Sequence, residues 1–270
     1  MSIKRTVSVS VLACMAYLFS VSLVYAVDFP YRKDFPNVSC ISSQELKAKY
    51  DKNEVIIVDV RSKIEYDAIH IDKSLHIPMA YATFVNDVEK LAKENPKKII
   101  AFYCNGVTCL KSYESAQKML EAGQKNCFAY DAGVPEWSKL YPADTIVMGK
   151  VLKDPEKQLI SDVEFKNRLI NFETFKAKAA KENVLVIDIR DHVQSSGKLP
   201  GHEKARVIPL DTFIPNFVAK KAEQDKTLLI FDQVGKQVQW LMYYLRENGY
   251  ENYFFLDKGA TEVLKKQEYK

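Results

Sequence analysis

The chain has 270 residues, of which 47% are hydrophobic and 27% charged, and its formal net charge is +4. This length suits one large domain or two of ordinary size, each able to bury a core. Positive and negative residues are interspersed along the chain, a pattern that excludes the concentrated basic surface of a typical nucleic-acid-binding protein.

Residues 1–26 have the pattern of a secretory signal peptide. Two basic residues precede an uncharged apolar stretch, and small residues stand where a signal peptidase cleaves, after Ala26. We therefore expect an exported protein, periplasmic or otherwise extracytoplasmic. An uncleaved anchor, the one case in which we expect membrane contact, and a lipoprotein start at Cys14 are alternatives, because about twenty apolar residues can span a bilayer.

The rest of the chain contains an internal repeat. "ISSQELKAKYDKNEVIIVDVR" (41–61) aligns without a gap with "INFETFKAKAAKENVLVIDIR" (170–190). A second block, "MLEAGQKNCFAYDAG" (119–133), aligns with "LRENGYENYFFLDKG" (245–259). Two matching blocks in the same order, at nearly the same separation, indicate two copies of one domain.

Each copy shows the same order of elements in the chain. A helical pattern leads into a short apolar run, a second such run follows, and then come an amphipathic helix and a last strand. Such short apolar runs, alternating with helices, are typical of buried strands in a parallel sheet. The predicted helices are 43–50, about 109–123 and 172–180, and the predicted strands are 55–60, 98–103, 127–130, 184–189, 227–231 and 253–256. The sequence thus predicts an α/β protein with two tandem domains, each a parallel sheet flanked by helices on both faces.

Cys104 stands at the end of the predicted strand 98–103. Ligands of open parallel sheets bind beyond the carboxyl ends of strands. The loop 105–108 then turns into a helix, so its backbone N–H groups and the helix dipole are expected to lower the pKa of the thiol. Gly106 allows the backbone to curl around the sulfur.

Both copies carry short motifs that together resemble the rhodanese family. The first has "VDVR" (58–61), "HIP" (76–78), a loop that starts with cysteine and a closing "DAGVPEW" (131–137). The second has "IDIR" (187–190) and "PGH" (200–202). On this resemblance we expect a signal peptide at 1–26, a rhodanese-like domain at 36–145, a linker at 146–159 and a second rhodanese-like domain at 160–270.

The resemblance implies a sulfurtransferase in which Cys104 is the catalytic nucleophile. Cys104 would take sulfane sulfur from a donor such as thiosulfate, carry it as a persulfide and pass it to cyanide or a thiol. The implied partners are therefore a small sulfur-containing donor and a thiol or cyanide acceptor, and neither a cofactor nor a metal is needed. The residues expected to bind the substrate are Asn105, Gly106, Val107, Thr108, Cys109 and Lys111.

Two positions depart from the family pattern. Family members that prefer thiosulfate commonly end the loop with a cation, where this chain has Cys109, although Lys111 lies just beyond. In the second copy Asp232 stands in place of the cysteine. A carboxylate cannot carry sulfur, so we expect the second copy to be catalytically degenerate, its carboxylate filling the same cradle of amides.

Other interpretations of the residues remain open at this stage. Cys104 and Cys109 would also suit a thiol redox protein, with or without a disulfide between them, and the degenerate copy would suit a binding module without activity. We expect Cys40 and Cys127 to be buried free thiols. The strand-end pairs, Asp59 with Arg61 and Asp188 with Arg190, are expected to support the loops, His70 and His202 to be structural, and Trp137 to serve packing.

Overall fold

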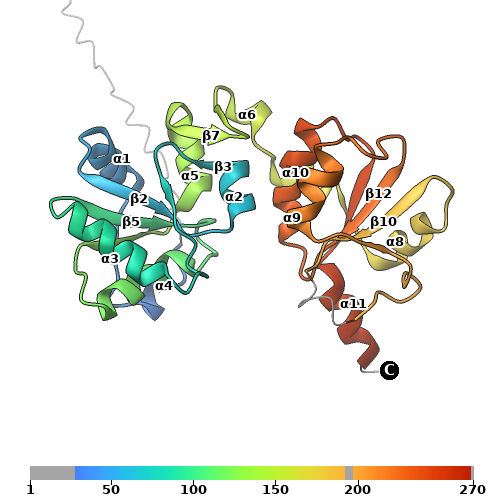
Figure 1. Ribbon diagram of the computed structural model, residues 1–270, viewed down its shortest axis with the longest axis horizontal. Helices are drawn as coiled ribbons and strands as arrows, with labels where there is room; N and C mark the ends of the chain where they lie inside the picture. The colour runs from blue at the N-terminus through green and yellow to red at the C-terminus, as the bar shows by residue number, and fades with distance from the viewer. Residues whose placement is uncertain (1–27, 192–196, 269–270) are drawn as a thin grey trace, which may run out of the picture.

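The computed structural model describes residues 28–191 and 197–268, which form two lobes (Figure 1). Each lobe is built around its own five-stranded parallel sheet, so the predicted fold class is confirmed. The expected signal peptide lies outside the described residues. Within the described ranges, none of the helices combines the length and apolar character that spanning a bilayer requires.

The sheet of the first lobe has the strand order β1-β6-β5-β2-β4. Its strands are β1 (Ser39–Cys40), β2 (Val55–Asp59), β4 (Leu75–His76), β5 (Ile99–Tyr103) and β6 (Cys127–Tyr130). Its helices are the short 3-10 helix η1 (Arg32–Asp34), α1 (Ser43–Asp51), α2 (Lys63–Ala68), α3 (Phe84–Glu94), α4 (Lys111–Glu121) and α5 (Gly133–Leu140). The predicted strand 127–130 matches β6, and the other predicted elements of this lobe differ by one or two residues at their ends.

Helices cover both faces of this sheet because successive residues of a strand point to opposite sides. On β5, Ile100 and Phe102 pack with residues of α3 and α4. Ala101 and Tyr103 point the other way and join a cluster with residues of α1, α2 and α5. The middle strand is therefore buried on both faces, which explains its continuous apolar sequence.

The second lobe repeats the strand order with the strands β9-β13-β12-β10-β11. They are β9 (Leu169–Ile170), β10 (Val184–Asp188), β11 (Arg206–Val207), β12 (Thr227–Phe231) and β13 (Tyr253–Leu256). Its helices are α8 (Phe172–Ala179), α9 (Leu210–Phe213), the π-helix η3 (Ile214–Val218), α10 (Gln237–Glu247) and α11 (Gly259–Glu268). Residues of α8 and α11 pack on one face, and residues of α9, η3 and α10 pack on the other.

The segment between the two parallel sheets is itself structured. After the 3-10 helix η2 (Pro142–Asp144), β7 (Thr145–Val147) and β8 (Lys150–Val151) form an antiparallel sheet with β3 (Ile69–Ile71). The short helices α6 (Pro155–Gln158) and α7 (Asp162–Lys166) then lead into the second lobe. Part of the expected linker, 146–159, is thus tied to the first lobe by backbone hydrogen bonds.

The two lobes meet where α10 packs against α2. The hydroxyl of Tyr244 on α10 donates to the carbonyl oxygen of Ile64 on α2 at 2.9 Å. Trp240, one turn earlier, lies with its ring 5.4 Å from the guanidinium carbon of Arg61. The second lobe therefore touches the segment that directly follows β2 of the first lobe.

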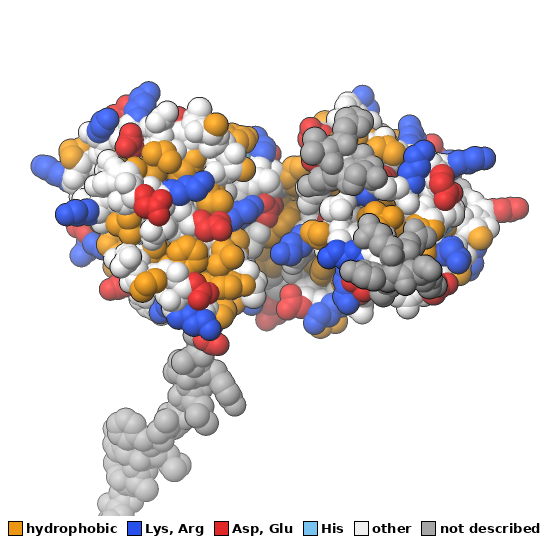
Figure 2. All heavy atoms as spheres, turned by 90° about the horizontal axis from the view of Figure 1, so that it is seen from below, with side chains coloured by type: hydrophobic (Ala, Val, Ile, Leu, Met, Phe, Trp, Pro, Cys, Tyr) orange, Lys and Arg blue, Asp and Glu red, His pale blue; other side chains and the backbone are white. Residues whose placement is uncertain are grey.

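Charged side chains of both signs are spread over the surface. On the face seen in Figure 2, Lys and Arg side chains alternate with Asp and Glu over both lobes. No patch of a single sign covers the described part of that face. On this face the charges of the two signs therefore largely offset one another.

Candidate active site at the end of β5

Cys104 directly follows β5, the middle strand of the first sheet. It lies at the carboxyl end of the strand, the place where the sequence predicts a ligand site. Its side chain is fully buried and joins the apolar cluster beneath α3 and α4. The backbone carbonyl of Cys104 accepts a hydrogen bond of 3.1 Å from the N–H of Val134, which fixes the strand end against the start of α5.

Two glycines allow the loop after Cys104 to lie close to α5. Gly106 has φ +93°, and a Cβ there would stand 3.0 Å from the carbonyl oxygen of Ala132. Gly133 has φ +62°, and a Cβ there would come within 2.4 Å of the Cys104 carbonyl oxygen. Both positions need a positive φ and have no room for a side chain. The positive φ of Gly106 agrees with the expected turn of the loop, but the missing Cβ makes room for the Ala132 carbonyl rather than for the Cys104 sulfur.

A buried ion pair supports the loop from below. Arg61 donates from Nε to Asp59 Oδ1 at 2.9 Å and from Nη2 to Asp59 Oδ2 at 2.6 Å, and both side chains are fully buried. Its Nη1 donates to Asn105 Oδ1 at 3.0 Å. The Asn105 amide in turn donates to Glu65 Oε1 at 2.6 Å. The expectation that Asp59 and Arg61 support the loop is confirmed, and Asn105 is the residue through which they do so.

Charge balance in this network keeps Glu65 ionised. Burial acts to raise its pKa, but Arg61 and the hydrogen bonds from Ser62 and Asn105 outweigh burial, and the pKa is lowered. The pKa of Arg61 is raised, because the carboxylate of Asp59 more than offsets the cost of its burial. The support beneath the loop is therefore a fixed set of charges that makes no use of a mobile proton.

The two thiols of the loop differ in chemistry. The Cys104 thiol donates to the Cys109 carbonyl oxygen at 3.5 Å and to the Ser112 hydroxyl at 3.7 Å. Burial, and then its hydrogen bond to the Cys109 side chain, raise the pKa of Cys104 well above its usual range. The same hydrogen bond lowers the pKa of Cys109 to about 6, helped by the N–H groups of Asn105 and Lys111 and by the Lys111 charge.

The expectation that the loop acidifies Cys104 is therefore wrong for this arrangement. The N–H groups of Asn105 and Lys111 stabilise the Cys109 thiolate, whereas the N–H of Ser112 favours the thiolate of Cys104. The physical reason is a turn within the loop, in which the N–H of Cys109 donates a hydrogen bond to the Gly106 carbonyl oxygen at 2.9 Å. This turn brings Cys109 over the amides and leaves Cys104 underneath, in the apolar layer. Both cysteines are free thiols.

The remaining predicted substrate-binding residues form the outer rim of the loop. Thr108 is exposed, and Val107 and Lys111 are half-buried. Lys111 is the first residue of α4, so the helix starts two residues later than the sequence pattern indicates. Ser112 was not predicted, although its place in the first turn after a cysteine loop is a signal that could have found it. Trp240 was not predicted either, because its contact with Arg61 comes from the other lobe.

The corresponding loop of the second lobe is built on the same frame. Arg190 pairs with Asp188 at 2.7 Å and donates to Gln233, which follows Asp232 as Asn105 follows Cys104. Asp232 is buried after β12, and its carboxylate accepts hydrogen bonds from the N–H groups of Gly235 and Gln237. The expectation that Asp232 fills a cradle of amides is confirmed.

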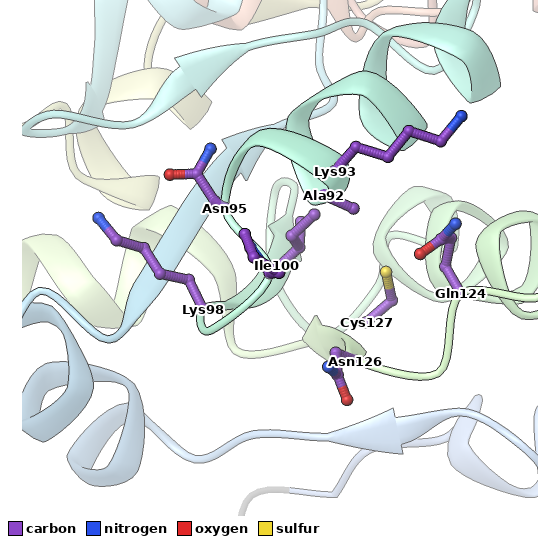
Figure 3. A pocket seen from close by; sticks show the side chains of 9 residues that line it. Ala92, Lys93, Asn95, Lys98, Ile100, Gln124, Asn126 and Cys127 are labelled. Atoms are coloured by element: carbon purple, nitrogen blue, oxygen red, sulfur yellow. The ribbon is translucent and has the colours of Figure 1, made fainter.

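The other cysteines and the aromatic residues have structural positions. Cys127 is buried as expected, while Cys40 is only half-buried, and burial raises the pKa of each to about 11. Cys127 starts β6 and lines a pocket of about 220 Å³ together with Lys93, Ile100 and Gln124 (Figure 3). Because β5 and β6 are parallel, this pocket lies at the opposite end of the sheet from Cys104. Trp137 is fully buried, in line with a packing role.

The histidines also have structural neighbours. The Nδ1 atom of His70 is hydrogen-bonded to the Tyr66 carbonyl at 2.8 Å, and the His202 ring packs edge-on against Phe172 and Phe175. The Nε2 atom of His76 is hydrogen-bonded to the Arg61 carbonyl at 3.0 Å. Neither these contacts nor any other within residues 28–191 and 197–268 gathers three side chains of the metal-binding types into one site.

Comparison with known proteins places the first lobe in a family. Residues 42–140 match the model of the rhodanese-like domain. The chain is 30% identical over 109 residues to the thiosulfate sulfurtransferase GlpE of Coxiella burnetii, an alignment that covers 40% of this chain and 92% of that protein. It is 28% identical over 103 residues to the tRNA uridine(34) hydroxylase of Erwinia tasmaniensis, covering 37% of this chain but only 28% of the relative.

A solved structure, a thiosulfate sulfurtransferase from Pseudomonas aeruginosa, aligns with 86% of this chain and 45% of its own, at 20% identity and a TM-score of 0.38. The alignment covers only part of the larger relatives, 28% of the hydroxylase and 45% of the Pseudomonas protein. Nearly the whole length of the small sulfurtransferase, by contrast, aligns with this chain at 30% identity. The chain thus belongs to the rhodanese-like family.

Proposed function

We propose that this protein is a sulfurtransferase that carries sulfane sulfur on Cys104. The observation that carries the proposal is a thiol at the carboxyl end of the central strand, held under a glycine-dependent loop that Arg61 supports through Asn105. The family match and the small sulfurtransferase relative support the same reaction class. The proposed partners are a small sulfur donor such as thiosulfate and a thiol or cyanide acceptor.

In the proposed reaction the Cys104 sulfur attacks the outer sulfur of thiosulfate. A bond forms between the two sulfurs, the bond to the sulfonate sulfur breaks, and sulfite leaves with its electron pair. Cys104 then carries a persulfide, and an acceptor nucleophile removes the outer sulfur and restores the thiolate. The oxyanion of the donor would meet the loop's rim, where the positive charge of Lys111 acts on Cys109.

Cys104 must lose its proton before it can attack, since the thiolate is the reactive form. Its own pKa is raised by burial, so bulk solvent does not supply this ionisation easily. Only a small fraction of Cys104 is therefore thiolate at neutral pH, and this fraction is the form that attacks the donor.

We further propose that the second lobe is a degenerate copy of the first, and that the protein is exported with cleavage after Ala26. The shared strand order and the matching frames of Asp59–Arg61 and Asp188–Arg190 support the duplication. The mass of the protein recovered from its natural host tests the export proposal. A chain that begins at Met1 in the cytoplasm would refute it.

The experiment that tests the sulfur-carrier proposal is intact-mass analysis after treatment with thiosulfate. We expect the Cys109→Ser variant to gain the mass of one sulfur atom and the Cys104→Ser variant to gain none. Peptide mapping should place the added sulfur on Cys104. Absence of added sulfur from both variants and from the unaltered protein, with no sulfite released, would refute the proposal.

A second candidate function is thiol redox chemistry by the same pair. The observation that favours it is the acidic thiol of Cys109 beside a second free thiol, an arrangement seen in dithiol proteins. The two functions differ in their dependence on a sulfur donor. If the protein oxidises or reduces disulfides rapidly, and neither takes up sulfur from thiosulfate nor releases sulfite, the redox function is the correct one.

A further inference from the structure

The two cysteines of the candidate active-site loop are in contact, but their side chains face different surroundings. Cys104 is fully buried and points its thiol toward Cys109 and Ser112. Cys109 is half-buried, on the outer side of the loop's turn. A sulfur carried by Cys104 would therefore lie next to a second nucleophile of the same chain before any external acceptor reaches it.

We propose that Cys109 is a resolving thiol, which attacks the persulfide on Cys104 and releases its outer sulfur as hydrosulfide. This inference rests on the proposed function of Cys104 as sulfur carrier. It adds an activity that transfer to an external acceptor does not include, the reduction of sulfane sulfur to hydrosulfide within the protein.

The step balances in atoms and electrons. The Cys109 thiolate attacks the inner sulfur of the persulfide, a bond forms between the sulfurs of Cys104 and Cys109, and the bond to the outer sulfur breaks. The outer sulfur leaves with the bonding pair and its proton as hydrosulfide. The two cysteines are oxidised to a disulfide while the sulfane sulfur is reduced, and an external thiol or dithiol reductant restores the two free thiols.

The geometry of the loop favours attack by this thiol. The Sγ atom of Cys104 lies 3.5 Å from the backbone carbonyl oxygen of Cys109, so the two residues are in contact before the reaction starts. The turn closed between Gly106 and Cys109 holds that approach. Since the pKa of Cys109 is about 6, the residue is largely a thiolate at neutral pH and ready to attack.

The sequence departure at Cys109 supports the same role. A cation at this position would only attract the donor, whereas a thiol there can also react with the product of the first step. Lys111 is close enough to lower the pKa of Cys109 by its charge. Lys111 thus supplies the positive charge near the loop, and Cys109 supplies the second nucleophile.

The test follows hydrosulfide release and disulfide formation in a single turnover. The reduced protein, freed of small thiols, is treated with one equivalent of thiosulfate, with no cyanide or other acceptor present. We expect the unaltered protein to release about one hydrosulfide per chain and to lose two hydrogens through a Cys104–Cys109 disulfide. The Cys109→Ser variant should keep the added sulfur on Cys104, with release slowed by at least about tenfold.

The matched control is Cys127→Ser, which removes a buried free thiol at the other end of the sheet. It should behave like the unaltered protein. Far-ultraviolet circular dichroism and melting curves establish that each variant is folded before it is assayed.

The possible outcomes separate this inference from the function on which it rests. A stable persulfide on the unaltered protein, without disulfide or hydrosulfide, overturns the role of Cys109 and leaves the sulfur carrier intact. Equal hydrosulfide release from the Cys109→Ser variant also overturns it. If no form of the protein takes up sulfur or releases sulfite or hydrosulfide, the proposed function itself is wrong.

Discussion

The loops after β5 and β12 share the same kinds of supporting residues but differ in the residue that follows the strand. In each lobe an arginine is paired with the aspartate two residues before it and donates to the amide side chain that follows the strand-end residue. In each lobe a glycine with φ near +60° packs on the carbonyl of that strand-end residue. The frame is therefore independent of whether the strand ends in Cys104 or in Asp232.

The difference between the loops lies in what satisfies the amides. The carboxylate of Asp232 accepts hydrogen bonds from the N–H groups of Gly235 and Gln237. These donors of the second loop are therefore satisfied by a residue of the same loop. Cys104 brings a neutral thiol that donates a hydrogen bond, and the amides of the first loop act mainly on Cys109 instead. The amides of the first loop therefore stabilise the side chain of Cys109 instead of a carboxylate.

The largest effect on sulfur transfer should come from replacing the residues that follow β5 and β12. Cys104→Ser should lower thiosulfate:cyanide transfer by roughly 1,000-fold or more, because serine cannot carry sulfane sulfur. Asp232→Ala should leave transfer largely intact and act on stability alone, since it only exposes two amides. Steady-state assays of the two variants at equal concentration measure the contrast. Loss of turnover in a folded Asp232→Ala protein would show that the second loop takes part in the reaction.

The next effect concerns the arginines that support the loops. Arg61→Met and Arg190→Met each leave a buried aspartate without its partner, so each should cost about 3–5 kcal/mol of stability. Chemical denaturation measures this cost. At a temperature where both variants are folded, only Arg61→Met should also lose sulfur transfer, because only Arg61 holds Asn105 in the catalytic loop. Equal activity in the two variants would contradict the positioning role of Arg61.

A smaller effect should appear in the reactivity of Cys109 with an alkylating reagent. The thiolate is the reactive form, so the rate should rise with pH and reach half its maximum near the pKa of about 6. Cys104→Ala removes the hydrogen bond that lowers this pKa, and the midpoint should move up toward the usual value of about 8.5. At neutral pH the rate should fall by roughly tenfold. An unchanged midpoint would show that the Cys104 thiol does not act on Cys109.

The smallest effect tests how far the second lobe stabilises the first. Tyr244→Phe removes the hydrogen bond between α10 and the Ile64 carbonyl and should lower stability by about 1 kcal/mol. Tyr250→Phe is the control, because its hydroxyl bonds only to carbonyls of its own lobe. Melting curves followed by near-ultraviolet circular dichroism compare the two. A shift for Tyr250→Phe alone would indicate that the contact between lobes contributes little.

The sequence alone determined the three inner strands of each parallel sheet and the position of the reactive loop. Short apolar runs bury strands such as β12 and β13 with the predicted bounds, because a strand covered on both faces leaves little choice of residue or length. The repeat predicted the two parallel sheets, and the change from Cys104 to Asp232 predicted the filled cradle of amides. These features depend on local pattern and on residues close together in the chain.

Only the tertiary structure decided which thiol is acidic and what lies beneath the loop. The sequence placed Cys104 at a helix start and predicted a lowered pKa, but the turn between Gly106 and Cys109 gives most of that stabilisation to Cys109 and leaves Cys104 buried. The contact of Trp240 with Arg61 joins residues of two lobes. The physical reason is that a pKa depends on burial and on the direction of a few hydrogen bonds. Both are fixed by packing between segments far apart in the chain, which no spacing of residues reveals.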